Sequence, residues 1–424
     1  MSRRYSRRLR PVGGLTAVVT AAVLSTATLP AHAVPEGTVV GAGRAGSVGG
    51  SYLVTLKEGI EGASAAGRDV AARYGAKISH TYGTVLNGYA VEASAAQAGR
   101  LAADSRVASV VQDSRVRLAR TQTNTQTNKQ ANTQAITRAN TRHSTQKHPP
   151  SWGLDRVDQA GLPLNGSYTS PGPAGAGVTV YVIDTGVRIT HADFGGRASY
   201  GWDFVGNDRS AGDGNGHGTH VAGIIAGTRY GVAKKARIVS VRVLDDTGSG
   251  TTAQVIAGVD WVTAHARRPA VANLSLGGYH SAQLDTAVRN SIKAGVTYTV
   301  AAGNDGLPAA RYSPADVSQA LTVGASDRTD TRPGFSDYGS AVDLFAPGVA
   351  ITSDSNASDT ARATYSGTSM AAPHVAGAAA LYLAGHPGAT PARVAGALIA
   401  RAASGKVSNA GRGSPNRLLR VPES

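Results

Sequence analysis

The chain has 424 residues, no cysteine and a formal net charge of +15 at pH 7. The length suits about two or three domains, and the lack of cysteine excludes disulfides, cysteine nucleophiles and thiolate metal sites. Residues 1–150 carry 19 Lys and Arg against 7 Asp and Glu, whereas residues 151–424 carry 23 against 20. The basic excess therefore lies in the first third of the chain, and a nucleic-acid-binding function loses its main support.

The first 33 residues have the three parts of a secretory signal peptide. A basic start, "MSRRYSRRLR", precedes an apolar stretch over 12–29 and the small-residue sequence "AHA" at 31–33. A membrane anchor is the alternative, but glycines and threonines interrupt the apolar stretch. No later stretch reaches the about 18 apolar residues that a spanning helix needs. The sequence predicts a secreted, extracellular protein with no membrane partner, exported by the general or the twin-arginine route.

Residues 51–118 predict a small α+β domain after a flexible, Gly- and Ala-rich lead-in at 34–50. Strand-like runs alternate with two short amphipathic helices, the first of which ends at Gly75. In chain order they are a strand at 51–59, a helix within 65–78, a strand at 88–94, a helix at 95–107 and a strand at 108–116.

Residues 119–148 predict a linker. The stretch is polar and of low complexity, with "TQTN" occurring twice in a row. Too little apolar surface is present to offset the entropy cost of ordering the backbone. Such a segment is a natural place for proteolytic separation of the parts beside it.

From residue 149 onward the composition predicts an α/β domain that extends to 424. Short apolar, β-branched runs alternate with helical stretches, which is typical of a parallel sheet covered on both faces. The strands are expected at 178–186, 237–245, 270–278, 295–305, 320–326 and 341–348, and the helices at 219–227, 251–266 and 281–295. In such sheets the site lies at the carboxyl ends of the strands.

Asp184 ends the first strand of this domain within "VTVYVIDTG". A turn carboxylate is one interpretation, and an aspartic protease is another, but that chemistry needs two carboxylates and a single Asp-Thr-Gly is present.

His217 lies between glycines just before a helix, and His220 follows three residues later. A zinc site on that helix is disfavoured, because the glutamate of a zincin helix is missing and no thiolate can complete the site. His220 is interpreted as a structural residue of the helix.

Ser369 in "GTSMAAPH" needs a base and an acid to act as a nucleophile. The order of an α/β-hydrolase, with the acid and the histidine after the serine, is excluded because Ser369 is followed by one carboxylate, Glu423, with no histidine after it. The order Asp184, His217, Ser369 remains open. Asn304 ends another strand and is either a turn residue or an amide donor to an oxyanion.

Five motifs in chain order resemble those of subtilisin-like serine proteases: "DTG", "GHGTHVAG", "SLGG", "AAGN" and "GTSMAAPHVAG". Other stretches, "PSWGLDRVDQ", "RVLDDTGSGT" and "FSDYGSAVDLFAPG", are most similar to the proteinase K branch, and the match covers nearly all of 149–420. The resemblance implies an α/β, three-layer fold with a mostly parallel central sheet. It also implies a serine endopeptidase that forms an acyl-enzyme.

The resemblance assigns roles to four residues of this chain. Asp184 would orient the histidine, His217 would act as general base and then acid, and Ser369 would be the nucleophile. Asn304 would share the oxyanion with the backbone N–H of Ser369. The primary specificity pocket would be lined by Ser275, Leu276, Gly277, Gly278, Ala301, Ala302 and Gly303, and its small walls imply a broad, apolar or aromatic preference.

A structural Ca²⁺ is also implied, held by the carboxylate of Asp343 and the backbone carbonyls of Ser318 and Ala320. The alternative is that Asp343 is an ordinary turn carboxylate, since "SPADVSQALTVGA" departs locally from the pattern of the relatives.

Residues 51–118 resemble the inhibitory propeptides of these proteases. Their expected function is to assist folding and to occupy the cleft until autocatalytic removal, with maturation near "LARTQTN" or anywhere up to Lys147. The expected partners are protein and peptide substrates and the chain's own propeptide, and a monomer is expected. A non-catalytic binding protein that kept the fold is the competing hypothesis.

Overall fold

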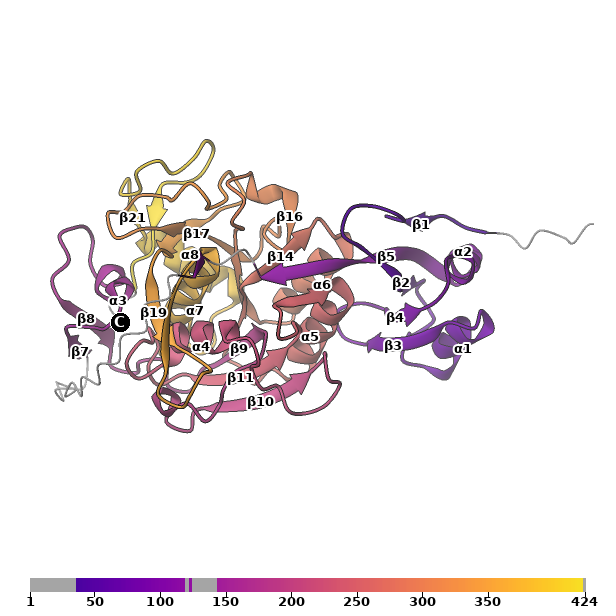
Figure 1. The fold of residues 1–424 in the computed structure, drawn as a ribbon, viewed down its shortest axis with the longest axis horizontal. Helices are drawn as coiled ribbons and strands as arrows, with labels where there is room; N and C mark the ends of the chain where they lie inside the picture. Colours follow the sequence, from indigo (N-terminus) through magenta and orange to yellow (C-terminus); the bar gives the residue numbers. More distant parts are fainter. Residues whose placement is uncertain (1–35, 119–121, 124–142, 422–424) are drawn as a thin grey trace, which may run out of the picture. The chain divides into compact units, whose positions relative to one another are not determined.

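A computed structural model describes residues 36–118, 122–123 and 143–421 of the chain (Figure 1). The predicted signal peptide at 1–33 and most of the predicted linker lie outside the described residues. Within the described residues, no helix is long and apolar enough to cross a membrane.

A nine-stranded sheet forms the centre of the region that follows the linker, in the order β10-β11-β9-β13-β15-β17-β18-β22-β21. Every neighbouring pair is parallel except β21 and β22. The strands are β9 (Thr179–Asp184), β10 (Ala198–Asp203), β11 (Arg237–Arg242), β13 (Ala270–Leu274), β15 (Thr297–Ala301), β17 (Leu321–Ser326), β18 (Leu344–Pro347), β21 (Ala403–Ser404) and β22 (Arg417–Leu418). The predicted, mostly parallel sheet is present.

Helices cover both faces of this sheet (Figure 1). Because side chains alternate along a strand, Val180 and Val182 pack into one buried cluster, and Tyr181 and Ile183 pack into another. Side chains of α4, α7 and α8 complete the first cluster, and those of α5 and α6 complete the second. The helices are α3 (Trp152–Val157), α4 (His217–Ala226), α5 (Thr252–His265), α6 (Ala282–Lys293), α7 (Thr368–Gly385) and α8 (Pro391–Arg401).

Residues before the linker form a second, smaller core around an antiparallel set of strands. The elements are β1 (Val39–Val40), β2 (Ser47–Leu56), α1 (Ala65–Arg73), β3 (Lys77–Tyr82), β4 (Gly88–Glu92), α2 (Ala95–Ala103) and β5 (Val107–Leu118). The predicted strands and helices are all present. β3 was not predicted, because it is a sheet edge of alternating burial that carries polar residues such as Lys77 and His80.

Three details differ from the prediction. The run 270–278 is two strands, β13 and β14 (Leu276–Tyr279), which are separated at Ser275. Residues 143–147 of the predicted linker form β7 (His143–Lys147), which pairs with β8 (Ser167–Pro171). Part of the predicted flexible lead-in pairs in the sheet as β1 and the start of β2.

The remaining short strands lie outside the central sheet. They are β6 (Gln122–Thr123), β12 (Ser249–Thr251), β16 (Tyr312–Ser313), β19 (Ile351–Asp354) and β20 (Arg362–Ser366).

Candidate active site

The candidate site lies at the carboxyl end of β9, where the strand order reverses. The next strands in the chain, β10 and β11, lie on one side of β9, whereas β13, β15 and β17 lie on the other. Such a switch point opens a crevice at the strand ends, where ligands of open α/β sheets bind. Asp184 is the last residue of β9.

Asp184 and His217 are in contact. His217 Nδ1 lies 2.7 Å from Asp184 Oδ1, which also accepts a hydrogen bond of 2.8 Å from the backbone N–H of Thr185. Both side chains are buried. Gly218 permits this approach, since a Cβ there would lie 2.0 Å from the carbonyl oxygen of Gly186. The acid and the histidine of the sequence prediction therefore meet as expected.

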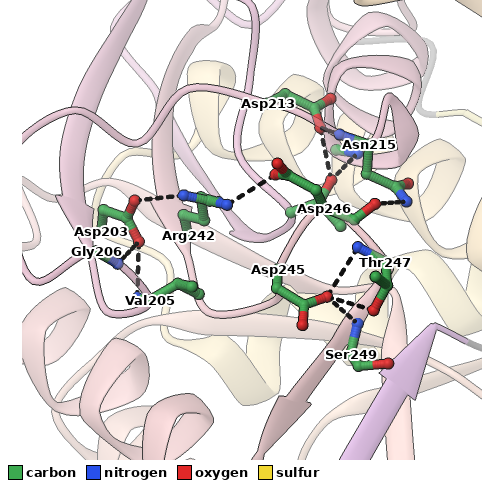
Figure 2. Close-up of polar contacts among 12 residues, drawn as sticks. Asp203, Val205, Gly206, Asp213, Asn215, Arg242, Asp245, Asp246, Thr247 and Ser249 are labelled. Carbon is green, nitrogen blue, oxygen red and sulfur yellow. Dashed lines mark hydrogen bonds and ion pairs between the residues drawn. The ribbon is translucent and has the colours of Figure 1, made fainter.

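Asp213 fixes the turn that carries His217 (Figure 2). Its Oδ1 accepts hydrogen bonds from the backbone N–H of Asn215 and Gly216, and its Oδ2 accepts one from the N–H of Thr219. Burial raises the pKa of the Asp213 carboxyl, while these hydrogen bonds lower it. Sequence reasoning did not identify Asp213, because its role depends on the folded turn.

A polar chain connects the same turn to β12 (Figure 2). Arg242 donates to Asp203 at 2.6 Å and to Asp246 at 2.8 Å, and the carbonyl of Asp246 accepts from Asn215 Nδ2 at 2.9 Å. The neighbouring Asp245 accepts hydrogen bonds from the N–H groups of the turn that leads to β12. The turn that carries His217 and the turn that leads to β12 are therefore each held by hydrogen bonds to one of two adjacent residues, Asp246 and Asp245.

Ser369 occupies the first turn of α7, whose N-cap is Gly367. Its Oγ donates a hydrogen bond of 3.1 Å to the carbonyl of Ser275, and Ser275 Oγ donates one of 2.9 Å to the carbonyl of Ser369. His217 Nε2 is buried and has no hydrogen-bond partner among the residues that the structure describes. The structure therefore does not join Ser369 to His217 by a hydrogen bond. A change of the Ser369 χ1 rotamer redirects the hydroxyl, and catalytic hydrogen bonds often form only with substrate bound.

Asn304 lies against the start of α7. Its Oδ1 accepts hydrogen bonds from Thr368 N at 2.9 Å and from Thr368 Oγ1 at 2.8 Å. A Cβ at Gly367 would lie 2.9 Å from Asn304 Nδ2, so the amide nitrogen faces the turn that carries Ser369. The first amides of a helix have no partner within the helix and favour negative charge. The predicted oxyanion donors are therefore close together.

A pocket of about 390 Å³ opens beside this site. Six of the seven residues predicted for the specificity pocket line it: Leu276, Gly277, Gly278, Ala301, Ala302 and Gly303. The seventh, Ser275, contacts Ser369 instead.

Two carboxylates that the sequence prediction did not include, Asp305 and Asp337, also line the pocket. Asp337 Oδ1 accepts hydrogen bonds from the backbone N–H of Asp305 and Leu307, and its Oδ2 is buried without a hydrogen-bond partner in the described part of the chain. Burial raises the pKa of Asp337 to about 6.

The end of β5 lies in the cleft as an added strand between β12 and β14. Val116 is opposite Gly250 on one side and Gly278 on the other, and Arg117 is opposite Ser249 and Gly277. The backbone N–H of Leu118 donates a hydrogen bond of 3.0 Å to the carbonyl of Gly248. The first domain therefore occupies the strand positions that an extended peptide would take.

The first domain also contacts α5 directly. The Oδ1 atom of Asp260 accepts hydrogen bonds of 2.7 Å and 2.8 Å from the backbone N–H groups of Thr84 and Val85. Tyr82 is buried and donates from its hydroxyl to the carbonyl of Ala253 at 3.1 Å. The buried carboxylate of Asp113 accepts from the N–H of Ala253 in the first turn of α5, where negative charge is favourable.

His220 and His217 do not converge. His220 Nε2 contacts the carbonyls of Ile351 and Ala363, its ring stacks on Tyr365, and burial lowers its pKa to about 3. This arrangement agrees with the interpretation of His220 as a structural residue rather than a zinc ligand.

Asp343 lies beside the segment that contains Ser318 and Ala320. Its Oδ2 accepts a hydrogen bond of 2.8 Å from Thr322 N, and burial raises the pKa of its carboxyl to about 6. A partly buried carboxylate suits an oxygen-binding cation such as Ca²⁺. The residues therefore fit the implied ion chemically.

Comparison with known proteins agrees with this arrangement. Residues 175–419 match the model of the Subtilase family, and residues 51–119 match that of Peptidase inhibitor I9. The chain is 45% identical to an extracellular serine proteinase of Thermus sp. (strain Rt41A), over 97% of this chain and 99% of the relative. It is 38% identical to a cuticle-degrading serine protease of Arthrobotrys oligospora, over 86% of this chain and 87% of the relative.

A solved structure, of a cold-adapted subtilisin-like serine proteinase, is 54% identical and covers 64% of this chain and 98% of its own, with a TM-score of 0.62. The chain belongs to the subtilase family. It is a subtilisin-like serine proteinase of the proteinase K-like type and carries an I9 inhibitor domain ahead of its proteinase domain.

Proposed function

We propose that this proteinase is a secreted, broadly specific endopeptidase that is made as an inhibited precursor and removes its own first domain. The contact of 2.7 Å between Asp184 and His217 beside the Ser369 turn, in a cleft already holding an added strand, supports the proposal best. Protein and peptide substrates are its expected partners.

In the proposed reaction, His217 Nε2 takes the proton of Ser369 Oγ as that oxygen attacks the peptide carbonyl. Asp184 holds the Nδ1–H and stabilises the imidazolium that forms. Asn304 Nδ2 and the Ser369 N–H receive the oxyanion. His217 then protonates the leaving amine, and water releases the acyl group from Ser369 by the reverse roles.

Replacing Ser369 by Ala tests this assignment. A triad serine accounts for about 10⁶ in turnover in a related system, so casein hydrolysis by the variant should fall to background. Ser358→Ala, a substitution at an exposed serine, is the matched control and should retain full activity. Substantial hydrolysis by the Ser369→Ala protein would reject the mechanism, and a folded but inactive wild-type protein would favour the non-catalytic binding hypothesis.

The strand register supports a particular cleavage point for autoprocessing. Leu118 is opposite Leu276, which directly follows Ser275, and the carbonyl of Ser275 contacts Ser369 Oγ, so the described part of β5 ends close to the nucleophile. Beyond the site, Gln122 is opposite Ser366 on β20, which leads into the Ser369 turn. We therefore propose that the first cut falls between Ala119 and Arg120, followed by trimming up to Lys147.

A time course of precursor processing, with amino-terminal sequencing of the first product, tests this register. The first product should begin at Arg120 in the wild type, and the Ser369→Ala precursor should stay intact. A first product with another amino terminus would overturn the register. Cleavage of the purified Ser369→Ala precursor at the same rate would overturn autoprocessing itself.

The proposed side-chain preference is apolar or aromatic, because small residues form most of the pocket wall. Peptides with Phe or Leu before the cleaved bond should exceed those with Glu in kcat/KM. Peptides with Lys or Arg at that position measure the influence of Asp305 and Asp337. A strong preference for the basic peptides would contradict the proposed specificity.

We also propose that Asp343, with the carbonyls of Ser318 and Ala320, binds a structural Ca²⁺. Removing Ca²⁺ with a chelator should lower the melting temperature of the Ser369→Ala protein. In Asp343→Asn, much of that difference should disappear, whereas the control Asp208→Asn, at an exposed position, should keep it. If the melting temperature is the same without Ca²⁺, the protein has no stabilising Ca²⁺. If the chelator lowers the melting temperature of Asp343→Asn as much as that of the parent, Asp343 does not bind the ion.

A further inference from the structure

A second group of titratable side chains lies away from the candidate active site, at the far end of β14. His280 directly follows β14, Asp285 lies in the first turn of α6, and Asp316 lies three residues beyond the end of β16. Each offers one potential ligand atom, and these atoms all lie within 4.8 Å of one another. Three separate elements thus bring one imidazole and two carboxylates to one point.

The distances inside this group suit a small divalent ion. His280 Nδ1 lies 2.9 Å from Asp316 Oδ2 and 3.4 Å from Asp285 Oδ2. Ligands of a tetrahedral Zn²⁺ at about 2.0–2.1 Å from the metal are about 3.3 Å apart, which falls between those two distances. The present contacts therefore need only small shifts to enclose an ion.

Each of the two carboxylates has one buried oxygen without a hydrogen-bond partner among the described residues. The Asp285 side chain is 3% exposed, and its Oδ1 has no hydrogen-bond partner among the described residues. Asp316 Oδ1 is likewise buried and without a hydrogen bond in this part of the structure. Negative charge here is therefore costly unless a cation or a proton compensates it.

The remaining ligand is open to solvent. The His280 side chain is 61% exposed, which gives an ion an entry path and leaves space for a water ligand. A mixed set of one imidazole nitrogen and two carboxylate oxygens suits zinc and similar first-row ions better than Ca²⁺, which prefers six to eight oxygen ligands.

We propose that His280, Asp285 and Asp316 form a binding site for one divalent transition-metal ion of the Zn²⁺ type. The ion would connect the end of β14 to the first turn of α6 and to the segment after β16. β14 and β16 are already paired through Gly278–Ser313 and Tyr279–Tyr312, and all four of these residues line the specificity pocket. The ion would thus act as a cross-link that holds this wall of the pocket, and its ligands differ from those of the proposed Ca²⁺ site.

Zinc binding to the full-length Ser369→Ala precursor tests the site, because binding can be measured without proteolysis. Isothermal titration with ZnCl₂ should detect one high-affinity equivalent that His280→Ala and Asp316→Asn both lose, with affinity reduced at least about tenfold. Both positions are at least partly exposed, so these variants keep the fold. His265→Ala is the matched control, since that exposed histidine stacks on Trp261 away from the group.

Two further readouts separate this site from general zinc binding. Co²⁺ should give the visible absorption of a low-coordinate complex in the parent and in His265→Ala, but not in His280→Ala. One equivalent of Zn²⁺ should raise the melting temperature of the parent more than that of either site variant. Equal zinc stoichiometry and affinity in the parent and both site variants would overturn the proposal. Binding of Ca²⁺ by this group with no binding of Zn²⁺ would overturn it as well.

Discussion

The two domains of the chain bury their sheets in different ways. The proteinase domain covers both faces of its central sheet with its own helices, α4, α7 and α8 on one side and α5 and α6 on the other. The inhibitor domain covers one face with α1 and α2, while Leu53, Tyr82 and Ala90 on the other pack in the cluster that contains α5 and α6. The proteinase domain thus completes its core by itself, whereas the inhibitor domain completes its core on its partner.

This difference suits an inhibitor that must be held and later removed. Apolar burial stabilises the contact between the domains as long as the chain is intact. If the proposed cut after β5 releases the inhibitor domain, we expect that domain to expose one apolar face and to be less stable than the proteinase domain. We therefore expect the same face to hold the inhibitor domain in the cleft and to leave the released domain open to degradation.

The largest expected effect comes from removing a side chain that joins the two domains. Tyr82→Ala should weaken inhibition by the separately produced inhibitor domain by about 10²-fold or more. A fully buried aromatic side chain is worth about 3–5 kcal/mol, and its hydroxyl contact with Ala253 is lost as well. The measurement is the inhibition constant against the mature enzyme.

Tyr89→Phe is the matched control for that comparison. Tyr89 lies in the inhibitor domain's own cluster and donates its hydroxyl hydrogen bond to Gly67 within the same domain. Its inhibition constant should stay close to that of the wild type. Equal constants for Tyr82→Ala and the wild type would show that the shared face does not hold the domains together.

Lowering the pH is expected to have an intermediate effect, which is a loss of stability of the proteinase domain. Burial lowers the pKa of His220 to about 3 and that of His374 to about 4, against about 6.5 in an unfolded chain. The folded state keeps both rings neutral, so their contribution to stability is complete above about pH 6.5 and is lost as the pH falls toward the folded values. Lowering the pH from 7 to 5 should therefore reduce the free energy of unfolding by about 2 kcal/mol for each ring.

Urea unfolding of the Ser369→Ala protein at pH 7 and pH 5 measures this loss. His374→Gln, which does not titrate, should reduce the difference between the two pH values by about 2 kcal/mol. His265→Ala, at an exposed position, should leave the difference unchanged. Because buried carboxyls with a raised pKa, such as Asp337, shift stability in the opposite direction, the comparison of His374→Gln with the parent decides, and an unchanged pH difference in His374→Gln would contradict a neutral, buried His374 ring.

The smallest expected effect comes from removing a helix cap in each domain, which compares the stabilities of the two domains. Ser94 caps α2 of the inhibitor domain in a capping box, and Thr390 caps α8 of the proteinase domain. Each change to Ala should cost about 1 kcal/mol of helix stability. Ser94→Ala should visibly lower the folded fraction of the isolated inhibitor domain in circular dichroism, whereas Thr390→Ala should lower the melting temperature of the proteinase by a few degrees. If Ser94→Ala lowers the stability of its domain no more visibly than Thr390→Ala lowers that of the proteinase, the inhibitor domain is not marginally stable.

Most of the fold could be predicted because its strands have strong local patterns. The runs around Val180 and Leu321 are apolar over several residues and end in turns, so their strands and their parallel arrangement follow from composition. β3 escaped prediction because its side chains alternate around Ile78 without an apolar majority. The break at Ser275 escaped because "AVANLSLGG" is continuous in composition, and only the cleft separates its two halves.

The sequence by itself determined the class of the protein and the order of its reactive residues. Motifs such as "DTG" and "GTSMAAPHVAG" are local, and the chain order Asp184, His217, Ser369 excluded other arrangements. Tertiary structure alone decided the contacts that depend on distant segments. These include the Asp213 support of the His217 turn, the rotamer in which Ser369 contacts Ser275, the Asp337 carboxylate in the pocket and the group of His280, Asp285 and Asp316. The physical reason is that a hydrogen bond or an ion site depends on distances of about 2–3 Å. Packing of separate elements sets such distances, and residue spacing along the chain does not.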